Sequence, residues 1–415
     1  MESFKKYNSI INFKKSALKE DSELGKLLLE SSECVVTEKI HGANFSVLLY
    51  AKYINETEYT VETKLAKRNQ ILEENEDFYN SDLIFQKYKE CFINVFYHLV
   101  GENIINPRDH TSASSAISVF GEIFGGGYGK ESILKQRIKK ESIREINNSK
   151  VLSLLPKSNE LTESETALEI QKIRQQLQRD GQWERYTEPK LVQQEVFYCD
   201  DNEFMAFDIH VNAKTNFYLD FKIFESICIK SNIPYIKPLM IASINNILQY
   251  LVGGKSEFEY FAGIDFREGF ITSIPKYFGL DNIPENIAEG IVIKPLHDVY
   301  FENGGRVVFK IKNKKFVERH GKPIKSVAVG VDVLQKLISL YPNYINNNRM
   351  QSAISKVGDN LTNDYDIILE MFRDVCADME NDYTDDFKLM SKNTRKKLTD
   401  LIFADCKKIV SSREL

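Results

Sequence analysis

The sequence predicts an α+β fold, in which antiparallel sheets are flanked by helices and an all-helical domain follows at the C-terminus. Short runs rich in β-branched and aromatic residues, such as residues 34–36, are typical of strands. Residues 81–100 instead carry apolar side chains at helical spacing. The pattern is helical throughout residues 326–415. We therefore expect two domains, residues 1–322 and residues 326–415.

Composition and cysteine usage exclude several classes of protein. With 415 residues, 42% apolar and 28% charged, the chain can bury a large core in a soluble fold. No apolar run is long enough to span a bilayer, and neither a secretory signal nor a transit peptide is evident. The six cysteines form no CxxC pair, so we expect no zinc site or disulfide framework, and a reducing intracellular compartment such as the cytoplasm. A net charge of −5 argues against indiscriminate coating of nucleic acid but permits a local basic groove.

The first part of the chain predicts one helix and then a series of strands. Residues 1–30 should contain a helix that ends near residue 29. Strands are expected within residues 31–72, and the helix of residues 81–100 follows them. A further strand at residues 116–124 is ended by three consecutive glycines.

A polar excursion then interrupts the strands. Residues 130–189 are charged and helix-prone, basic at first and acidic later, with few aromatic residues. This composition predicts an inserted helical subdomain or a partly disordered loop, and it favours a solvated excursion over a dedicated nucleic-acid-binding arm.

Strands are expected again in the second half of the first domain. They cover residues 191–211, with a turn at 199–202, and residues 287–295 and 306–312. An apolar helix is expected near residues 241–252.

The tail is expected to begin after a hinge at His-Gly-Lys-Pro, residues 320–323. Residues 364–382 place their apolar side chains on one helical face. A basic run follows at residues 392–397.

Thr-Glu-Lys-Ile-His-Gly-Ala-Asn, residues 37–44, is the candidate reactive stretch. Lys39 lies between two predicted strands, which makes it a candidate covalent nucleophile. Gly42 would let the backbone turn tightly and approach a phosphate. Because Lys-x-x-Gly recurs at residues 276–279, the tetrad alone identifies nothing.

Four other strand segments carry charged side chains where a packed sheet would prefer apolar ones. These residues are Glu122, Asp208, Glu289, Lys294, Lys310 and Lys312. Alternation along a strand puts Lys310 and Lys312 on one face, and puts Glu289 and Lys294 on opposite faces. The solvent face of an ordinary sheet would explain any one of these segments. Together with Lys39, the set instead suits a phosphate and a divalent metal.

The chemistry of such a set follows from its charges. An amine attacks phosphorus only in its neutral form, which neighbouring cations such as Lys310 and Lys312 favour. The same cations stabilise charge on a transferring phosphoryl group. Glu289 would hold a metal or orient Lys39. Phe207 could stack on a base, although a core position is the commoner explanation for a phenylalanine.

These segments resemble the ordered motifs of covalent nucleotidyltransferases. The matching segments are residues 39–44, 66–68, 120–122, 206–208, 289–294 and 310–312. His41 and Asn44 make the first of them similar to the nick-sealing RNA ligase 2 family, which includes RNA-editing ligases. The opening residues 4–12 also resemble that family, whereas the tail is similar only in size, position and helicity.

The resemblance implies an adenylyltransferase domain and an ATP-dependent RNA ligase. Lys39 would attack ATP to form lysyl-AMP, AMP would pass to an RNA 5′-phosphate, and a 3′-hydroxyl would then seal the strand. The implied substrates are ATP, with Mg²⁺ or Mn²⁺, and RNA ends in a duplex or bridged context, in repair or editing. No membrane partner is expected, and protein partners stay open.

The resemblance also implies a role for each motif residue. His41 would assist the departure of pyrophosphate, Phe207 would stack on adenine, and Glu289 would hold the metal. The implied catalytic residues are Lys39, His41, Glu289, Lys310 and Lys312. The implied nucleotide-binding residues are Glu38, Lys39, Ile40, Asn44, Arg68, Glu122, Phe207, Asp208, Lys294, Lys310 and Lys312.

Two alternatives stay open at this point. DNA ligases and RNA-capping guanylyltransferases share Lys-x-x-Gly, but they typically carry aspartate where His41 stands and append a β-barrel where helices follow here. A non-catalytic RNA-end-binding protein is disfavoured because every motif lysine and carboxylate is present. The excursion at residues 130–189 departs from the family pattern, which usually keeps the third and fourth motifs close together in sequence.

Overall fold

The computed structural model describes residues 4–12, 26–27, 33–74, 76–127, 130–155, 163–193, 195–212, 216–247, 270–281, 283–316, 333–358 and 364–413. The hinge expected at residues 320–323, most of the helix expected in residues 1–30, and the domain boundary expected at residues 322–326 lie outside these ranges. Within them, no helix is both long and apolar enough to cross a bilayer.

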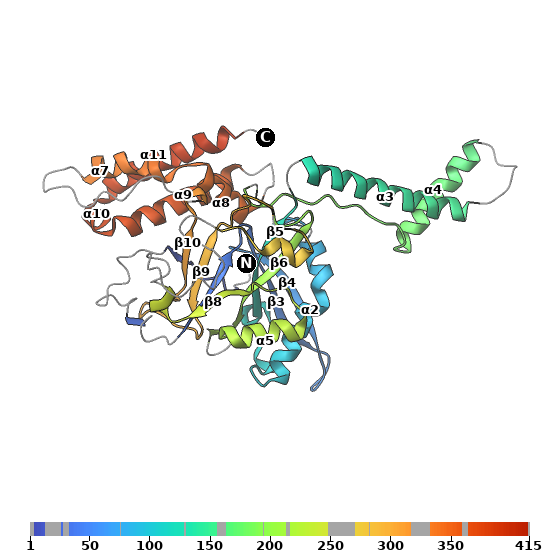
Figure 1. Cartoon of the computed structure of the whole chain (residues 1–415), viewed down its shortest axis with the longest axis horizontal. Helices are drawn as coiled ribbons and strands as arrows, with labels where there is room; N and C mark the ends of the chain where they lie inside the picture. Colours follow the sequence, from blue (N-terminus) through green and yellow to red (C-terminus); the bar gives the residue numbers. More distant parts are fainter. Residues whose placement is uncertain are drawn as a thin grey trace.

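Two five-stranded sheets form the body of the molecule (Figure 1). The first sheet has the order β1-β10-β9-β2-β8, and all its pairs are antiparallel except β1 with β10. Its strands are β1 (Ile11–Asn12), β2 (Cys34–Lys39), β8 (Pro238–Ala242), β9 (Gly290–Pro295) and β10 (Phe309–Lys312). The second sheet is antiparallel, with the order β4-β3-β5-β6-β7. Its strands are β3 (Ala43–Tyr53), β4 (Tyr59–Lys67), β5 (Ile117–Gly125), β6 (Asn202–Val211) and β7 (Phe217–Tyr218).

The chain passes from the first sheet to the second at residues 40–42, directly after Lys39. β2 is the fourth strand of its sheet, and Cys34, Val35 and Val36 are fully buried there. β3 is paired on both sides, with β4 and β5. The candidate nucleophile therefore stands at the junction of two rigid sheets.

Helices α2 (Ser81–Gly101) and α5 (Phe221–Ser231) cover the second sheet. Phe92, Phe96 and Leu99 on α2 share one helical face and are completely buried, as the spacing predicted. They belong to the main hydrophobic core together with Phe204 of β6 and Phe224 of α5. A second core, under the first sheet, includes Val36, Ile291 and Phe309. Short 3₁₀ turns connect elements at Pro107–Asp109, Ala113–Ser115, Ile274–Phe278 and Lys314–Phe316.

The polar excursion is helical, and it extends away from the body (Figure 1). It contains α3 (Lys130–Leu154) and α4 (Glu163–Arg179). Ion pairs at its base join Lys139 to Asp201 and Lys190 to Asp77. Most side chains of the arm are exposed, in keeping with a solvated excursion.

The tail has its own hydrophobic core, as an independent domain requires. It consists of α7 (Val333–Leu340), a 3₁₀ turn (Tyr341–Tyr344), α8 (Asn347–Val357), α9 (Asp364–Asp382), α10 (Thr384–Leu389) and α11 (Lys392–Ser411). The apolar face predicted for α9 is confirmed by Ile367, Met371 and Val375, which are buried against α11. The tail contacts the body through α8, where Lys67 donates to the Val357 carbonyl at 3.2 Å.

Two segments differ from the sequence expectation. The described residues of 191–199, which exclude residue 194, form no strand, and side-chain contacts hold them instead; the Phe197 amide, for example, donates to Asn286 Oδ1. The helix expected near residues 241–252 is wrong at its start, since Ile241 pairs with Val35 in β8. β8 is a short, continuous apolar run, and such a run suits either a strand or a helix.

Candidate active site

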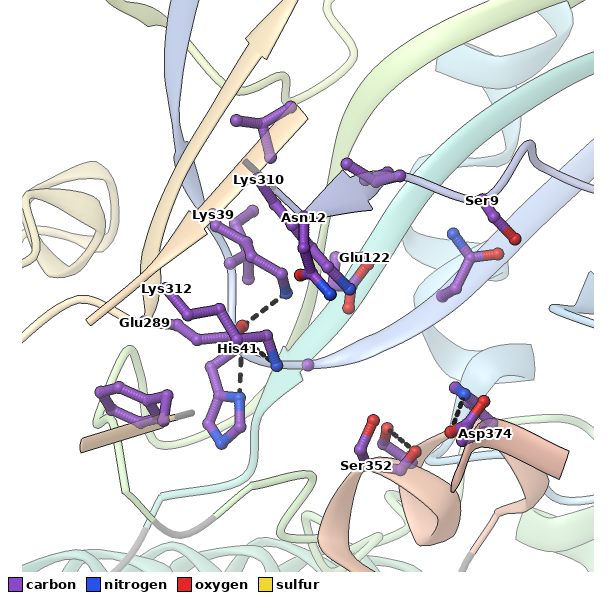
Figure 2. Close-up of a pocket in the computed structure, with 18 of the residues that line it drawn as sticks. Ser9, Asn12, Lys39, His41, Glu122, Glu289, Lys310, Lys312, Ser352 and Asp374 are labelled. Atoms are coloured by element: carbon purple, nitrogen blue, oxygen red, sulfur yellow. Dashed lines mark hydrogen bonds and ion pairs between the residues drawn. The ribbon is translucent and has the colours of Figure 1, made fainter. Parts of the chain in front are cut away.

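Lys39, at the end of β2, meets a carboxylate that it shares with two other basic side chains (Figure 2). Lys39 Nζ donates to Glu289 Oε2 at 2.6 Å. Lys312 Nζ lies 2.8 Å from Glu289 Oε1, and His41 Nδ1 lies 3.3 Å from Oε2. We call Lys39, His41, Glu289 and Lys312 the cavity cluster. The structure thus brings together residues from three segments that are up to 273 positions apart, Lys39 to Lys312.

The Glu289 side chain points toward Lys39 where the backbones of β9 and β10 come close together at Gly290. A Cβ at Gly290 would lie 2.0 Å from the Ile311 carbonyl oxygen, so only glycine fits between β9 and β10 here. Glu289 precedes β9, and alternation along the strand does not apply to it. The expectation that Glu289 and Lys294 face opposite sides is therefore wrong, since both line one cavity.

Gly42 is needed for a reason other than the one the sequence suggested. A Cβ there would lie 2.3 Å from the Ile123 carbonyl oxygen and 2.7 Å from the Glu122 side chain. The glycine therefore lets the turn after Lys39 pack directly on β5. This packing brings Glu122 of β5 beside the turn, and β3 pairs Asn44 with Glu122.

The His41 side chain is held on both ring nitrogens. Its Nε2 donates to Glu195 Oε2 at 2.9 Å, because a carboxylate only accepts, and its Nδ1 faces Glu289. The His41 amide donates to the Tyr198 hydroxyl at 2.8 Å. Burial alone would lower the pKa of His41, but Glu289 and Glu195 outweigh burial and raise it. The ring is therefore biased toward its cationic form.

The electrostatics of the cavity cluster favour an ionised Glu289. Burial opposes its charge, yet Lys312, Lys39 and His41 hold the pKa of Glu289 well below its usual range. Burial raises the pKa of Glu122 to about 7, against the opposing charge of Lys39. Burial likewise raises the pKa of Glu38 to about 7, against hydrogen bonds from Thr272 and Ser273.

The cluster forms part of the wall of a cavity of about 1190 Å³. Such a volume accommodates a nucleotide and leaves room for a second substrate. Twelve residues expected from the sequence line it: Glu38, Lys39, Ile40, His41, Asn44, Arg68, Glu122, Phe207, Glu289, Lys294, Lys310 and Lys312. The tail supplies the facing wall from α8 and α9, where Figure 2 shows Ser352 and Asp374 across from Lys39.

Asp208 is the one expected nucleotide-binding residue that does not line this cavity. It is fully buried and accepts from Lys294 Nζ at 2.9 Å and from Arg306 Nη1 at 2.6 Å. Tyr7 donates to it at 2.8 Å, and Arg306 also binds Asp298. We call Asp208, Lys294, Asp298, Arg306 and Tyr7 the buried cluster. The buried cluster holds Lys294 at the cavity wall. Asp208 itself lies behind this wall and contributes through its contact with Lys294.

The side chains of the site suit a divalent cation only if a bound substrate supplies further metal ligands. Among the described residues, no group of three or more His, Cys, Asp and Glu side chains could hold a metal. Mg²⁺ commonly uses one or two carboxylates together with substrate phosphates and waters. Glu289, which the sequence assigned to the metal, and Glu122 both reach the cavity and fit this pattern.

Sequence reasoning missed several residues that hold the site. Glu195 and Tyr198 bind His41 from a segment without regular structure. Arg306 and Tyr7 complete the buried cluster. The available signal for Arg306 was an arginine at the start of the expected strand 306–312, which carries two site lysines.

Comparison with known proteins identifies two matching family models. The RNA ligase model matches residues 32–312, which is more than half of the chain. The model of the T4 RNA ligase 2 C-terminal domain matches residues 328–408, which the sequence motifs could not align.

Similar proteins include two mitochondrial ligases of Trypanosoma brucei brucei. RNA-editing ligase 2 is 22% identical over 422 residues, covering 92% of this chain and 85% of that protein. RNA-editing ligase 1 is 25% identical over 280 residues, covering 65% of this chain and 46% of that protein, so the chain matches less than half of its length.

Among solved structures, RNA ligase variants of Naegleria gruberi are similar, one without ligand and one with ATP and Mn. Each is 13% identical, with a TM-score of 0.36, covering 76% of this chain and 58% of the other. With both family models matched in order, around a lysine at the junction of two sheets, the chain belongs to the RNA ligase 2 family.

Proposed function

We propose that this protein is an ATP-dependent RNA ligase that joins 3′-hydroxyl and 5′-phosphate RNA ends, sealing nicks in duplex or bridged RNA. The observation that supports this most is the cavity cluster, in which the Lys39 amine lies 2.6 Å from a carboxylate and beside Lys312 and His41. A nucleophile surrounded by cations suits attack on a polyphosphate.

In the first step Lys39 would form lysyl-AMP. The amine loses a proton, and Glu289 Oε2 is the acceptor within hydrogen-bonding distance. The lone pair of Nζ attacks the α-phosphorus of ATP, a P–N bond forms, and the P–O bond to pyrophosphate breaks. Lys310 and Lys312 line the cavity where the α-phosphate charge develops, and His41 would assist the leaving pyrophosphate. A divalent cation held by Glu289, Glu122 and the phosphates would neutralise further charge.

The remaining steps transfer the AMP to RNA and release it. An oxygen of the RNA 5′-phosphate attacks the lysyl-AMP phosphorus, and the P–N bond breaks as Lys39 regains its proton. The 3′-hydroxyl then loses its proton as it attacks the 5′-phosphorus, forming the phosphodiester and releasing AMP. We expect the RNA end to enter between the cavity cluster and the facing wall, which α8 and α9 supply.

The nucleotide would be held by the lining residues named above. Phe207 lies at the cavity wall and would stack on adenine. The backbone at Glu38 and Ile40 would read its edge, because the Glu38 carboxylate is turned away toward Thr272. Arg68 and Glu122 would lie near the ribose and the RNA end.

Labelling with α-³²P-ATP tests the proposal. The protein should acquire label that survives denaturation, and Lys39→Ala should acquire none. A nicked RNA duplex should be sealed faster than nicked DNA, which would separate this function from that of a DNA ligase. A labelled Lys39→Ala protein, or nicked RNA bound without any adenylation, would contradict the proposal.

A further inference from the structure

His41 receives its position from a segment that no sequence motif marked. Residues 195–199 run between the helical arm and β6, and we call them the strap. Glu195 binds the ring of His41 and Tyr198 binds its amide. The strap therefore controls both the backbone and the ring of this residue.

The strap itself is rigidly anchored. The amide of Phe197 donates to Asn286 Oδ1 at 3.0 Å, and Asn286 Nδ2 donates back to the Phe197 carbonyl at 2.6 Å. The Cys199 carbonyl accepts from the amide of Gly127 at 3.0 Å. Tyr198 is 1% exposed and packs edge-on against Phe124. These contacts restrict the movement of the strap. They therefore also restrict the movement of the Glu195 side chain, which projects from the strap and binds His41.

Glu195 completes the confinement of the imidazole ring. The ring packs edge-on against Phe316 at 5.1 Å, and Glu289 lies at its Nδ1. Glu289 is shared with Lys39 and Lys312, so it is occupied by two ammonium groups as well as by His41. The hydrogen bond to Nε2 is the largest influence on the Glu195 carboxylate and lowers its pKa, and the charge of Lys315 lowers that pKa to a smaller extent.

We propose that Glu195 is a positioning residue that fixes the His41 ring for the first step of the reaction. Its hydrogen bond holds a proton on Nε2 and keeps Nδ1 toward Glu289, so the ring is presented at one orientation beside Lys39. Without Glu195 the ring can rotate, and the cation would leave the place where pyrophosphate charge develops. The inference rests on the proposed function and goes beyond it by assigning a residue outside the motifs.

Glu195→Ala tests this inference, with Glu195→Gln as the conservative variant. Single-turnover formation of lysyl-AMP should be about 10- to 100-fold slower in Glu195→Ala at saturating ATP. The ATP concentration at half-maximal rate should change less than threefold. Glu195→Gln should recover most of the rate, because an amide oxygen accepts the same hydrogen bond. Glu188→Ala is the matched control, since Glu188 is an exposed carboxylate on the chain leading to the strap.

A second assay separates positioning from general damage. Sealing of nicked RNA that already carries 5′-adenylate bypasses lysyl-AMP formation, so Glu195→Ala should seal it within about threefold of the wild-type rate. An equal loss in both assays would overturn the inference, as would a wild-type rate of lysyl-AMP formation. A change confined to the half-saturating ATP concentration, or a Glu195→Gln protein as slow as Glu195→Ala, would also overturn it. Failure of the wild-type protein to adenylylate would instead reject the proposed function.

Discussion

Lys39 and Lys294 are both strand lysines that line the same cavity, yet their carboxylate partners are arranged differently. Around Lys39, one carboxylate serves Lys39, Lys312 and His41, whose side chains are 19%, 14% and 14% exposed. Around Lys294, Asp208 and Asp298 face Lys294 and Arg306, and none of the four is more than 9% exposed.

This difference indicates that the cavity cluster is a reactive site and that the buried cluster supports it structurally. The buried cluster balances two carboxylates with two cations, and its hydrogen bonds satisfy Asp208 from three sides. The cavity cluster has three basic side chains, faced by two carboxylates when Glu195 beside His41 is counted, so positive charge stays in excess and the cluster remains open to a ligand. Excess positive charge at a cavity wall is suited to an anion such as a polyphosphate. Substitutions in the buried cluster should therefore reduce stability, and those in the cavity cluster should reduce activity.

The largest expected effect is on folding, from Arg306→Ala. This change leaves Asp208 and Asp298 buried without their guanidinium partner, so the free energy of unfolding should fall by about 3–5 kcal/mol. Denaturant unfolding measures the loss. Lys312→Ala is the matched cation deletion in the cavity cluster and should cost far less stability. Equal losses for the two variants would contradict the distinction.

Glu289→Gln should produce the converse result. The charge that orients Lys39 and His41 is removed, while Lys39 and Lys312 stay hydrated at the cavity. The rate of lysyl-AMP formation should fall about 10²- to 10³-fold, which corresponds to about 2.7–4 kcal/mol. The unfolding free energy should fall by less than it does in Arg306→Ala, because the amide that replaces the carboxylate still hydrogen-bonds Lys39 and Lys312, which are themselves 19% and 14% exposed. A stability loss as large as that of Arg306→Ala would show that Glu289 is chiefly structural.

A buried histidine near the buried cluster, His210, should make the free energy of unfolding depend on pH. His210, next to Tyr218, is 1% exposed, and neither of its ring nitrogens has a partner among the described residues. Burial lowers its pKa to about 3, assisted by the charges of Lys5 and Arg306 and opposed by that of Asp208. Between about pH 6.5 and pH 3 the unfolded chain therefore binds more protons at this position, and stability falls as the pH falls.

This titration would remove roughly 2 kcal/mol between pH 6.5 and pH 5, at about 1.4 kcal/mol per unit. Denaturant unfolding at a series of pH values measures it, and His210→Phe should flatten the profile in this window. Asp208, whose pKa is lowered by Arg306 and Lys294 despite burial, should add a further loss only below about pH 4. An unchanged slope in His210→Phe would reject the assignment.

The smallest expected effect is that of Tyr7→Phe. The change removes one hydrogen bond to Asp208 while Arg306 and Lys294 still bind that carboxylate. Stability should fall by about 1 kcal/mol, with Tyr97→Phe on the exposed face of α2 as a control. Adenylylation should be retained, because the ring of Tyr7 still packs edge-on against Phe207. A loss of adenylylation without a loss of stability would place Tyr7 among the reactive groups.

The sequence predicted the strands that carry the site because charged residues inside apolar, alternating runs are conspicuous. That pattern pointed to Glu289 and Lys312, and the place of Lys39 between two strands pointed to Lys39; the structure brings the three together. It could not show whether a strand carboxylate faces a cavity or a buried cation, and Asp208 does the latter through Arg306, 98 residues away. The α+β fold class is confirmed by the two sheets and the helical tail.

Residues outside regular structure were beyond prediction for a physical reason. Glu195 lies in an irregular segment, where no periodicity indicates the direction of a side chain, and its partner is 154 residues away. Local propensity also failed at Ile241, because pairing with β2 decided between strand and helix. Both outcomes depend on contacts between distant segments.

The most direct test of the central claim is to locate the AMP on the protein. The wild-type chain would be incubated with ATP, digested and analysed by tandem mass spectrometry of its lysine-containing peptides. Our account predicts a single AMP adduct on Lys39, where the cavity cluster surrounds the amine. An adduct on Lys276, in the other Lys-x-x-Gly sequence, or on any lysine outside the cavity would contradict it, as would the absence of any adduct.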